Sequence, residues 1–331
     1  MKAQADLVLE GGGVKGIGLV GAVARLDRDL RFERVAGSSV GALVAALVAA
    51  GYDGDELHAT LLDFPFGKVR HRSGFDEVPL IGPASSLVMG RGIYDTTFVR
   101  DWLADRLERR DVRTFGDLRH ADSGSAFAEA RRFRLVVTAT DVTSGELLYL
   151  PWNYGSHFGL DPDAQLVADA VAASIAIPFY FDPLHLTDVR TNRTHTLVDG
   201  GVLSNFPITV FDRSDGEQPR WPTFGVKIVP QLPSHDAEMI PIAGRIHIAG
   251  VRQLESVVAT MIAGRDQTYL ERPCVAMRTM QVDTHEVSIV DFGVDDATKQ
   301  LVFANGWNEA DRFLAGWSWP NYLARCGTRR E

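Results

Sequence analysis

The chain is poor in cysteine, with two in 331 residues, Cys274 and Cys326. Two cysteines cannot build the disulfide framework of a small secreted domain, nor supply a cysteine-rich metal site. No group of histidines and carboxylates has the spacing of metal ligands either. We therefore expect no metal and no cofactor, and the low cysteine content favours a reducing compartment.

A long apolar segment is also lacking. The longest apolar run, residues 40–50, is too short to span a bilayer and is expected to be a buried helix. The first residues, MKAQADLVLEGGG, show neither a long apolar core nor a small-residue cleavage site, so no signal peptide is expected. A cytoplasmic protein is predicted, whose contact with a membrane would be peripheral.

Positive charge is in deficit, because 34 lysines and arginines face 43 aspartates and glutamates, for a formal net charge of −9. Such a chain has no overall positive field to attract nucleic acid or anionic lipid. A nucleic-acid partner is therefore not expected. The basic stretch Lys68, Arg70, His71 and Arg72 is interpreted as solvated loop charge.

Apolar runs alternate with helical patterns in the first fifty residues, which indicates a parallel sheet with crossover helices. Residues 6–10 and 34–38 are the apolar runs, and apolar residues recur at helical spacing over 16–30 and 40–50. Further strands are expected at 133–140, 146–150, 195–199, 223–229 and 287–292, and further helices at 97–107, 164–176, 245–270 and 295–317.

The chain reads as one domain over residues 1–331, since no repeat, low-complexity tract or linker divides it. Residues 61–94 interrupt the periodicity with eight glycines and prolines between apolar residues such as Phe64, Phe66 and Leu87. A loop this long is either a functional lid or a meandering surface insertion, and both interpretations stay open.

Residues 37–41, GSSVG, fit the pattern G-x-S-x-G between an apolar run and an apolar helix. This context is typical of a tight strand-to-helix turn that lifts a serine hydroxyl above the sheet, with the helix N-terminus beneath its oxyanion. Glycine is needed at both ends because a side chain there would crowd the turn. We interpret Ser39 as a nucleophile rather than a buried structural serine.

A glycine-rich segment, residues 11–16 (GGGVKG), joins the first strand to the first helix. Consecutive glycines let backbone N–H groups face an anion, and the helix dipole helps. A Walker A loop is excluded, because Lys-Ser/Thr should follow the last glycine and Ile17-Gly18 stands there.

Two interpretations of this loop remain. Gly11, Gly13 and Gly16 satisfy G-x-G-x-x-G, but a dinucleotide site requires an acidic residue at the end of the second strand, and none stands there. An oxyanion hole explains both loops together, because both follow carboxyl ends of parallel strands. We favour the oxyanion hole, in which Gly12 and Gly13 amides reach the acyl oxygen attacked by Ser39.

A nucleophilic serine requires a base, and none of the nine histidines lies in a motif that announces a Ser-His-Asp triad. For His195 we expect a surface or packing role. Asp199 ends an apolar run and precedes two glycines, so its carboxylate should emerge at the carboxyl rim of the sheet. The alternative is an aspartate that only hydrogen-bonds its own turn, which is common before glycine.

Four blocks in this order resemble the patatin-like phospholipase family: residues 11–16 (GGGVKG), 37–41 (GSSVG), 173–181 (ASIAIPFYF) and 199–201 (DGG). Residues 90–95 (GRGIYD) are similar to the short glycine-and-aromatic stretch that members carry after the second helix. The resemblance covers about residues 6–210, and nothing in about 215–331 matches a motif, so the function of that part is unassigned.

The resemblance implies an α/β protein with a three-layer α/β/α fold, a mainly parallel central sheet and a Ser–Asp dyad without histidine. The residues that match the family's motifs are Ser39 as nucleophile, Asp199 as general base, Gly11, Gly12 and Gly13 as oxyanion hole, and Lys15 and Gly16 as support of that loop. Lys15 would support the developing negative charge or be solvated at the start of the helix. Glu10 stands where members often carry Asp or a small residue.

The predicted activity is phospholipase A-like cleavage of fatty acyl esters in phospholipids or other lipids, through an acyl-enzyme. Asp199 should be partly desolvated, since a free aspartate is a poor base for serine. Three alternatives stay open: an effector of the same fold held off until an activating ligand or protein binds, a nucleotide-binding protein, and a catalytically dead lipid-binding module. The intact Ser39 and Asp199 speak against the last.

Overall fold

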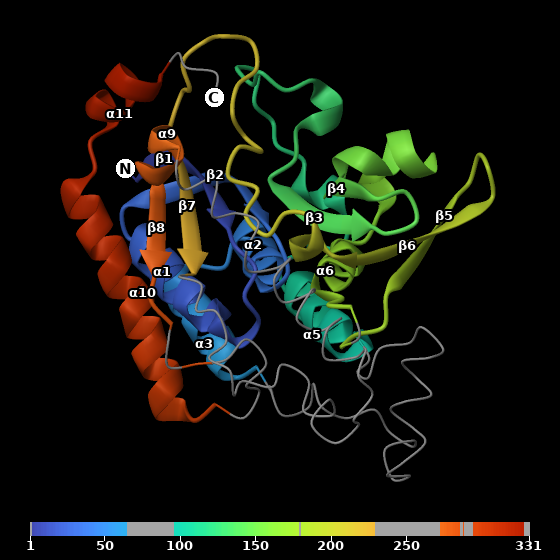
Figure 1. Ribbon diagram of the computed structural model, residues 1–331, viewed down its shortest axis with the longest axis horizontal. Helices are drawn as coiled ribbons and strands as arrows, with labels where there is room; N and C mark the ends of the chain where they lie inside the picture. The colour runs from blue at the N-terminus through green and yellow to red at the C-terminus, as the bar shows by residue number, and fades with distance from the viewer. Residues whose placement is uncertain are drawn as a thin grey trace, which may run out of the picture.

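One mixed sheet forms the centre of the computed structural model, which describes residues 2–64, 96–178, 180–228, 272–284, 287 and 294–327 (Figure 1). Its strands follow the order β5-β6-β3-β2-β1-β7-β8, and β4 pairs with β3 outside this path. The strands are β1 (Ala3–Leu9), β2 (Leu30–Gly37), β3 (Leu135–Asp141), β4 (Glu146–Leu150), β5 (Leu184–Asp188), β6 (Arg193–Asp199), β7 (Thr223–Ile228) and β8 (Thr279–Val282).

The parallel part of the sheet consists of β3, β2, β1, β7 and β8, while β4 and β6 run antiparallel to β3 and β5 antiparallel to β6. Residues 5–9 of β1 are all buried, as expected for a central strand covered on both faces. The predicted mixed α/β architecture with a mainly parallel sheet is confirmed.

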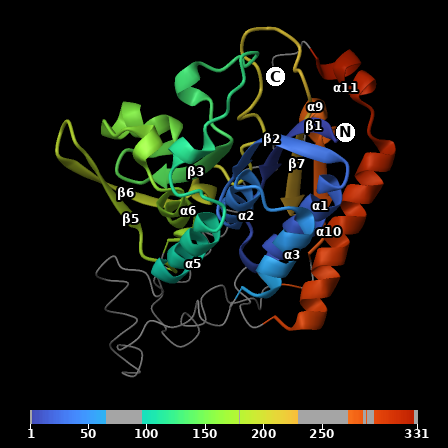
Figure 2. The same cartoon turned by 180° about the vertical axis from the view of Figure 1, so that it is seen from behind.

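Helices cover both faces of this sheet. The helices are α1 (Gly16–Asp27), α2 (Val40–Ala49), α3 (Gly54–Leu62), α5 (Thr97–Glu108), α6 (Val167–Ile175), α9 (Pro273–Ala276), α10 (Asp296–Gly316) and α11 (Trp319–Cys326). One face packs in a common core with α1, α2 and α6. The other face contacts residues 206–211 and Val275 of α9. Figure 2 shows α10 alongside α1 from behind.

The predicted elements before residue 229 lie close to observed ones, and 146–150 coincides with β4. The sequence prediction missed α3, β5, α9, β8 and α11. The helix expected at 245–270 lies outside the described residues, and so does the strand expected at 287–292 apart from Val287, which lies in a bend.

The interrupted segment 61–94 also lies mostly outside the described residues, together with the basic stretch 68–72 and residues 90–95. Its first part is described and differs from a lid. Leu61 belongs to α3, and Phe64 is buried, with its ring 4.8 Å from that of Trp102 in an edge-on arrangement.

The two cysteines form a disulfide, which corrects the inference drawn from their number. Cys274 in α9 and Cys326 in α11 have Cα atoms 5.7 Å apart, with a sequence separation of 52. A cysteine count cannot reveal this pairing, because the fold brings the two helices together. The argument for a reducing compartment therefore loses its basis. Within the described ranges, no helix combines the length and the apolar content needed to cross a bilayer.

Candidate active site

Ser39 occupies the tight turn between β2 and α2. Its backbone has φ 52° and ψ −129°, a region that non-glycine residues rarely adopt, and the residue is buried. A Cβ at Gly37 would lie 2.4 Å from the carbonyl carbon of Gly41, and one at Gly41 would lie 2.4 Å from the Glu10 carbonyl oxygen. The turn therefore excludes side chains at both glycines, as the sequence pattern predicts.

Asp199 reaches the same place from a different direction. It is the last residue of β6, which runs antiparallel to β3, and it pairs with Ala139 of β3. On the same edge of β3, Val137 pairs with Gly37 of β2, because β4 occupies the opposite edge through the pairs Val137–Leu150 and Ala139–Leu148. The carboxyl ends of β2 and β6 therefore face each other along this edge, which brings Asp199 level with the turn that follows Gly37. The expectation of Asp199 near the nucleophile turn holds, although its strand is antiparallel.

The Ser39 side chain lies beside the Asp199 carboxylate and favours its ionised form. Asp199 is 1% exposed, and burial raises its pKa to about 7. The Ser39 side chain and the Gly201 N–H, which donates to Oδ1 at 2.7 Å, oppose that rise. A carboxylate with a pKa near neutrality is suited to accept a proton from serine. The structure therefore shows the desolvation expected for Asp199.

The glycine loop lies directly beside Ser39. A Cβ at Gly11 would be 2.9 Å from Ser39 Cβ, and one at Gly16 would be 2.6 Å from Val40 Cγ2. Gly13 has φ 55°, in the left-handed region that favours glycine. The loop also packs against β7, since a Cβ at Gly12 would be 2.3 Å from Ile228 Cδ1.

The three glycine amides differ in what they can do. The Gly11 N–H donates to the Asn205 carbonyl oxygen at 3.2 Å, so it is engaged and does not serve an oxyanion. For the N–H groups of Gly12 and Gly13, the part of the chain that the structure describes provides no acceptor. These two amides are the ones that can stabilise negative charge on a bound acyl oxygen.

Lys15 is not solvated at the start of α1, contrary to one of the two roles expected for it. Lys15 is 6% exposed. Burial lowers the pKa of its ammonium group, and the charges of Asp283 and Glu10 oppose that shift. Glu10 in turn forms an ion pair with Lys227 and accepts the Ile228 N–H at 2.6 Å. The glycine loop thus begins from a buried group of charges.

Two residues that the sequence reasoning missed hold the site together. Ser174 of α6 accepts the Ser39 backbone N–H at its Oγ, at 2.8 Å. Asn205 binds both backbone groups of Gly11. Its carbonyl oxygen accepts the Gly11 N–H, and its Nδ2 donates to the Gly11 carbonyl oxygen at 3.0 Å. Ser174 lies inside the 173–181 block, whereas no sequence motif marks Asn205.

His195 has the packing role expected for it. Its Nδ1 lies 2.6 Å from Asp141 Oδ2, and its ring meets Phe158 edge-on at 5.3 Å. Among the described residues, no three His, Cys, Asp or Glu side chains gather as metal ligands would. The site therefore combines a serine hydroxyl, a buried carboxylate and two backbone N–H donors. These are the groups that an acyl-transfer reaction uses.

Comparisons with known proteins agree with this chemistry. Residues 7–212 match the family model of patatin-like phospholipases. A Bacillus subtilis protein, YqhO, is 40% identical over 229 residues, which are 68% of this chain and 72% of YqhO. The cGAMP-activated phospholipase of Escherichia coli is 24% identical over 220 residues, 61% of this chain and 52% of that enzyme.

A solved structure shares the fold. The crystal structure of VipD from Legionella pneumophila superposes with a TM-score of 0.53 at 17% identity, covering 94% of this chain and 66% of VipD. At this identity the match shows the fold alone. The chain spans 72% of YqhO but only about half of the cGAMP-activated enzyme.

Proposed function

The chain belongs to the patatin-like phospholipase family, and from this premise we propose that it hydrolyses fatty acyl esters of lipids, with Ser39 as nucleophile and Asp199 as general base. The observation that carries the proposal is the position of the Ser39 side chain beside a buried carboxylate, that of Asp199, whose pKa burial raises to about 7. An aspartate that served only its own turn would not need contact with a serine in a strained turn.

The reaction proceeds in two acyl transfers. The Ser39 oxygen bonds to the ester carbonyl carbon while its proton passes to Asp199. The tetrahedral intermediate collapses as the alcohol leaves, taking the proton from Asp199. Water then attacks the acyl-enzyme, giving a proton to Asp199, and the Ser39 oxygen regains that proton as the fatty acid departs.

The Gly12 and Gly13 amides stabilise the oxyanion in both steps. Removing one such donor typically costs about 3 to 4 kcal/mol of transition-state stabilisation. Gly11 contributes differently from what the sequence predicts, because its N–H is bonded to Asn205 and fixes the loop rather than the oxyanion. Lys15 supports the loop from within the protein, and Gly16 allows α1 to approach Val40.

The substrate we propose is a glycerophospholipid or lysophospholipid presented at a membrane surface, to which the protein would bind peripherally. The family supports the lipid class, and the −9 formal charge argues for apolar rather than electrostatic attraction to the membrane. The position of the cleaved bond follows from mass spectrometry of the products.

The deciding experiment measures fatty-acid release from mixed phospholipid vesicles by the wild type, Ser39→Ala and Asp199→Asn. We expect release by the wild type and its loss in both variants. Asp141→Asn is the matched control, because Asp141 is likewise a buried aspartate at the end of a strand but contacts His195 rather than Ser39. Equal activity of wild type and Ser39→Ala on every ester would refute the proposal.

A second candidate, an effector of the same chemistry that needs an activating ligand, is favoured by two Escherichia coli relatives described as cGAMP-activated and cUMP-AMP-activated phospholipases. If it applies, the wild type is silent on vesicles alone and releases fatty acid when a cyclic dinucleotide is added. A short p-nitrophenyl ester would still report the Ser39-dependent chemistry in the absence of activator.

A further inference from the structure

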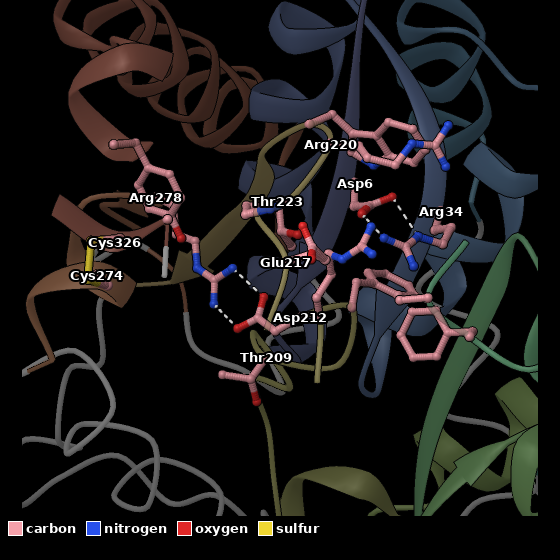
Figure 3. Close-up of a pocket in the computed structure, with 18 of the residues that line it drawn as sticks. Asp6, Arg34, Thr209, Asp212, Glu217, Arg220, Thr223, Cys274, Arg278 and Cys326 are labelled. Carbon is pink, nitrogen blue, oxygen red and sulfur yellow. Dashed lines mark hydrogen bonds and ion pairs between the residues drawn. A yellow bond between two sulfur atoms is a disulfide. The ribbon is translucent and has the colours of Figure 1, made fainter. Parts of the chain in front are cut away.

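A cavity of about 120 Å³ lies at the end of the sheet opposite Ser39 (Figure 3). Thr223, the first residue of β7, lines it, as does Arg278, which directly precedes β8. Ser39 and the glycine loop follow the opposite, carboxyl ends of parallel strands. The cavity is therefore separate from the proposed active site.

One wall of the cavity carries a fixed cation. Arg34 donates through Nε and Nη2 to both carboxylate oxygens of Asp6, at 3.0 and 2.5 Å. Its guanidinium also lies over the rings of Phe127 and Phe211, at 5.0 and 4.8 Å from their centroids. The Asp6 side chain is 1% exposed and that of Arg34 is 14% exposed, so this pair is largely buried in the wall.

The other wall carries a second guanidinium, that of Arg278, whose carboxylate partner is partly exposed to solvent. Arg278 donates through Nη1 and Nη2 to the two carboxylate oxygens of Asp212, each at 2.6 Å. The Arg278 side chain is 6% exposed, whereas that of Asp212 is 40% exposed. Figure 3 shows this pair across the cavity from Arg34 and Asp6. Asp212 can turn into water while Arg278 stays in the wall.

The remaining lining adds positive charge and hydroxyl groups. Five arginines line the cavity against four carboxylates (Arg34, Arg213, Arg220, Arg272 and Arg278; Asp6, Asp122, Asp212 and Glu217), in a protein of net charge −9. Arg220 forms an ion pair with Asp122 and Arg213 with Asp215, and displacement of Asp212 by a ligand would remove the carboxylate that Arg278 binds. Thr209 and Thr223 also line it, and their hydroxyls can donate to further oxygens.

We propose that this cavity binds a phosphate group, with Arg278 as its main ligand and Asp212 as the carboxylate that the phosphate displaces. A guanidinium fork fits a phosphate edge as it fits a carboxylate, and several donors converging from different directions suit a tetrahedral oxyanion. The cavity volume of about 120 Å³ is well above the roughly 10–15 Å³ that one water molecule requires, which leaves room for a phosphate with a short substituent.

The phosphate could belong to a free phosphomonoester or to a lipid headgroup, and the experiment separates the two. The purified protein is titrated calorimetrically with inorganic phosphate and with glycerol 3-phosphate. In parallel, co-sedimentation of Ser39→Ala is measured with phosphatidylcholine vesicles with and without phosphatidic acid. Binding of glycerol 3-phosphate identifies a free ester, and binding confined to phosphatidic acid vesicles identifies a headgroup.

Two variants with opposite expected effects test the geometry. Arg278→Gln should weaken binding roughly tenfold or more, as expected for a lost charge-assisted pair. Asp212→Asn should strengthen it several-fold, since the competing carboxylate is gone. Asp163→Asn is the matched control, because Asp163 also accepts two hydrogen bonds from one arginine, Arg119, outside the cavity.

Arg278→Lys is a second variant in case Arg278→Gln fails to fold. It keeps the positive charge but loses the forked guanidinium, so it should bind phosphate more weakly than the wild type. Thermal denaturation checks that each variant is folded. The proposal is overturned if neither phosphate probe nor phosphatidic acid binds, if Asp212→Asn does not bind more tightly than wild type, or if Asp163→Asn strengthens binding as much as Asp212→Asn does.

Discussion

The side chain of Ser39 lies beside the carboxylate of Asp199 although their strands, β2 and β6, are not paired with each other in the sheet. Both strands pair with the same edge of β3, to which β2 is parallel and β6 antiparallel. The end of β6 is therefore directed back towards the turn that follows β2. This arrangement buries Asp199 beside the serine and gives it the raised pKa on which the first two predictions depend.

The activity should rise with pH through the pKa of Asp199. The carboxylate accepts the serine proton only when ionised, so kcat/KM on a neutral p-nitrophenyl ester should climb to a plateau with a midpoint near 7. A pH–rate profile measures it, and Asp141→Asn should keep the same midpoint. A flat profile between pH 5 and 9 would contradict the assignment of Asp199 as base.

Asp199 should also destabilise the fold as pH rises. Its folded pKa, about 7, exceeds the ordinary value of 3.8, so the folded state holds the proton more tightly than the unfolded chain. Stability is lost between about pH 4 and pH 7, by on the order of 4 kcal/mol at most. Asp199→Asn removes this loss and should therefore raise the melting temperature more at pH 8 than at pH 5. An equal gain at both values would refute the linkage.

Gly12→Ala should impair turnover through a single contact. The new Cβ would lie 2.3 Å from Cδ1 of the buried Ile228, so either that side chain or the loop amides must shift, and we expect the amides to move. Loss of one oxyanion donor lowers kcat by about 100- to 1,000-fold. Ile228→Val removes only that Cδ1 atom, so the double variant should recover much of the activity.

Gly155→Ala is the control for this prediction, because the nearest atom to a Cβ there is 3.8 Å away. It should leave kcat and KM unchanged. If Ile228→Val fails to rescue a folded Gly12→Ala, the glycine is needed for a reason other than contact with Ile228.

Glu10→Gln should destabilise the protein more than its conservative nature suggests. Lys227 is 1% exposed and would be left without its carboxylate partner. Breaking a buried ion pair by removing one member typically costs about 3 to 5 kcal/mol. The double variant Glu10→Gln/Lys227→Met should recover part of that loss, as urea denaturation can show. If the loss of stability in the double variant equalled the sum of the losses in Glu10→Gln and Lys227→Met, the two charges would not interact.

Reduction of the disulfide should lower stability without abolishing the site. Cys274 and Cys326 close a loop with a sequence separation of 52, for which chain entropy gives a stabilisation of about 4 kcal/mol. Melting curves with and without dithiothreitol measure the difference, and Cys274→Ser/Cys326→Ser should not respond to reductant. Ser39 lies at the other end of the sheet, so ester turnover below the melting temperature should persist.

Local sequence determined much of this protein. The run of residues 5–9 requires a strand buried on both faces, and glycines at 37 and 41 require the tight turn that presents Ser39. These features depend on side-chain size and hydrophobicity within a few residues. Asp199 was also predictable as a strand end followed by glycines, although the antiparallel direction of its strand was not.

Only the tertiary structure decided which distant groups meet. Ser174 binds the Ser39 amide and Asn205 holds the Gly11 peptide, because separate elements converge there. Lys15 is buried rather than solvated, and the cysteines pair, for the same reason. Chain spacing encodes a turn or a strand, but burial, pKa and partner choice depend on the packing of segments far apart in the sequence.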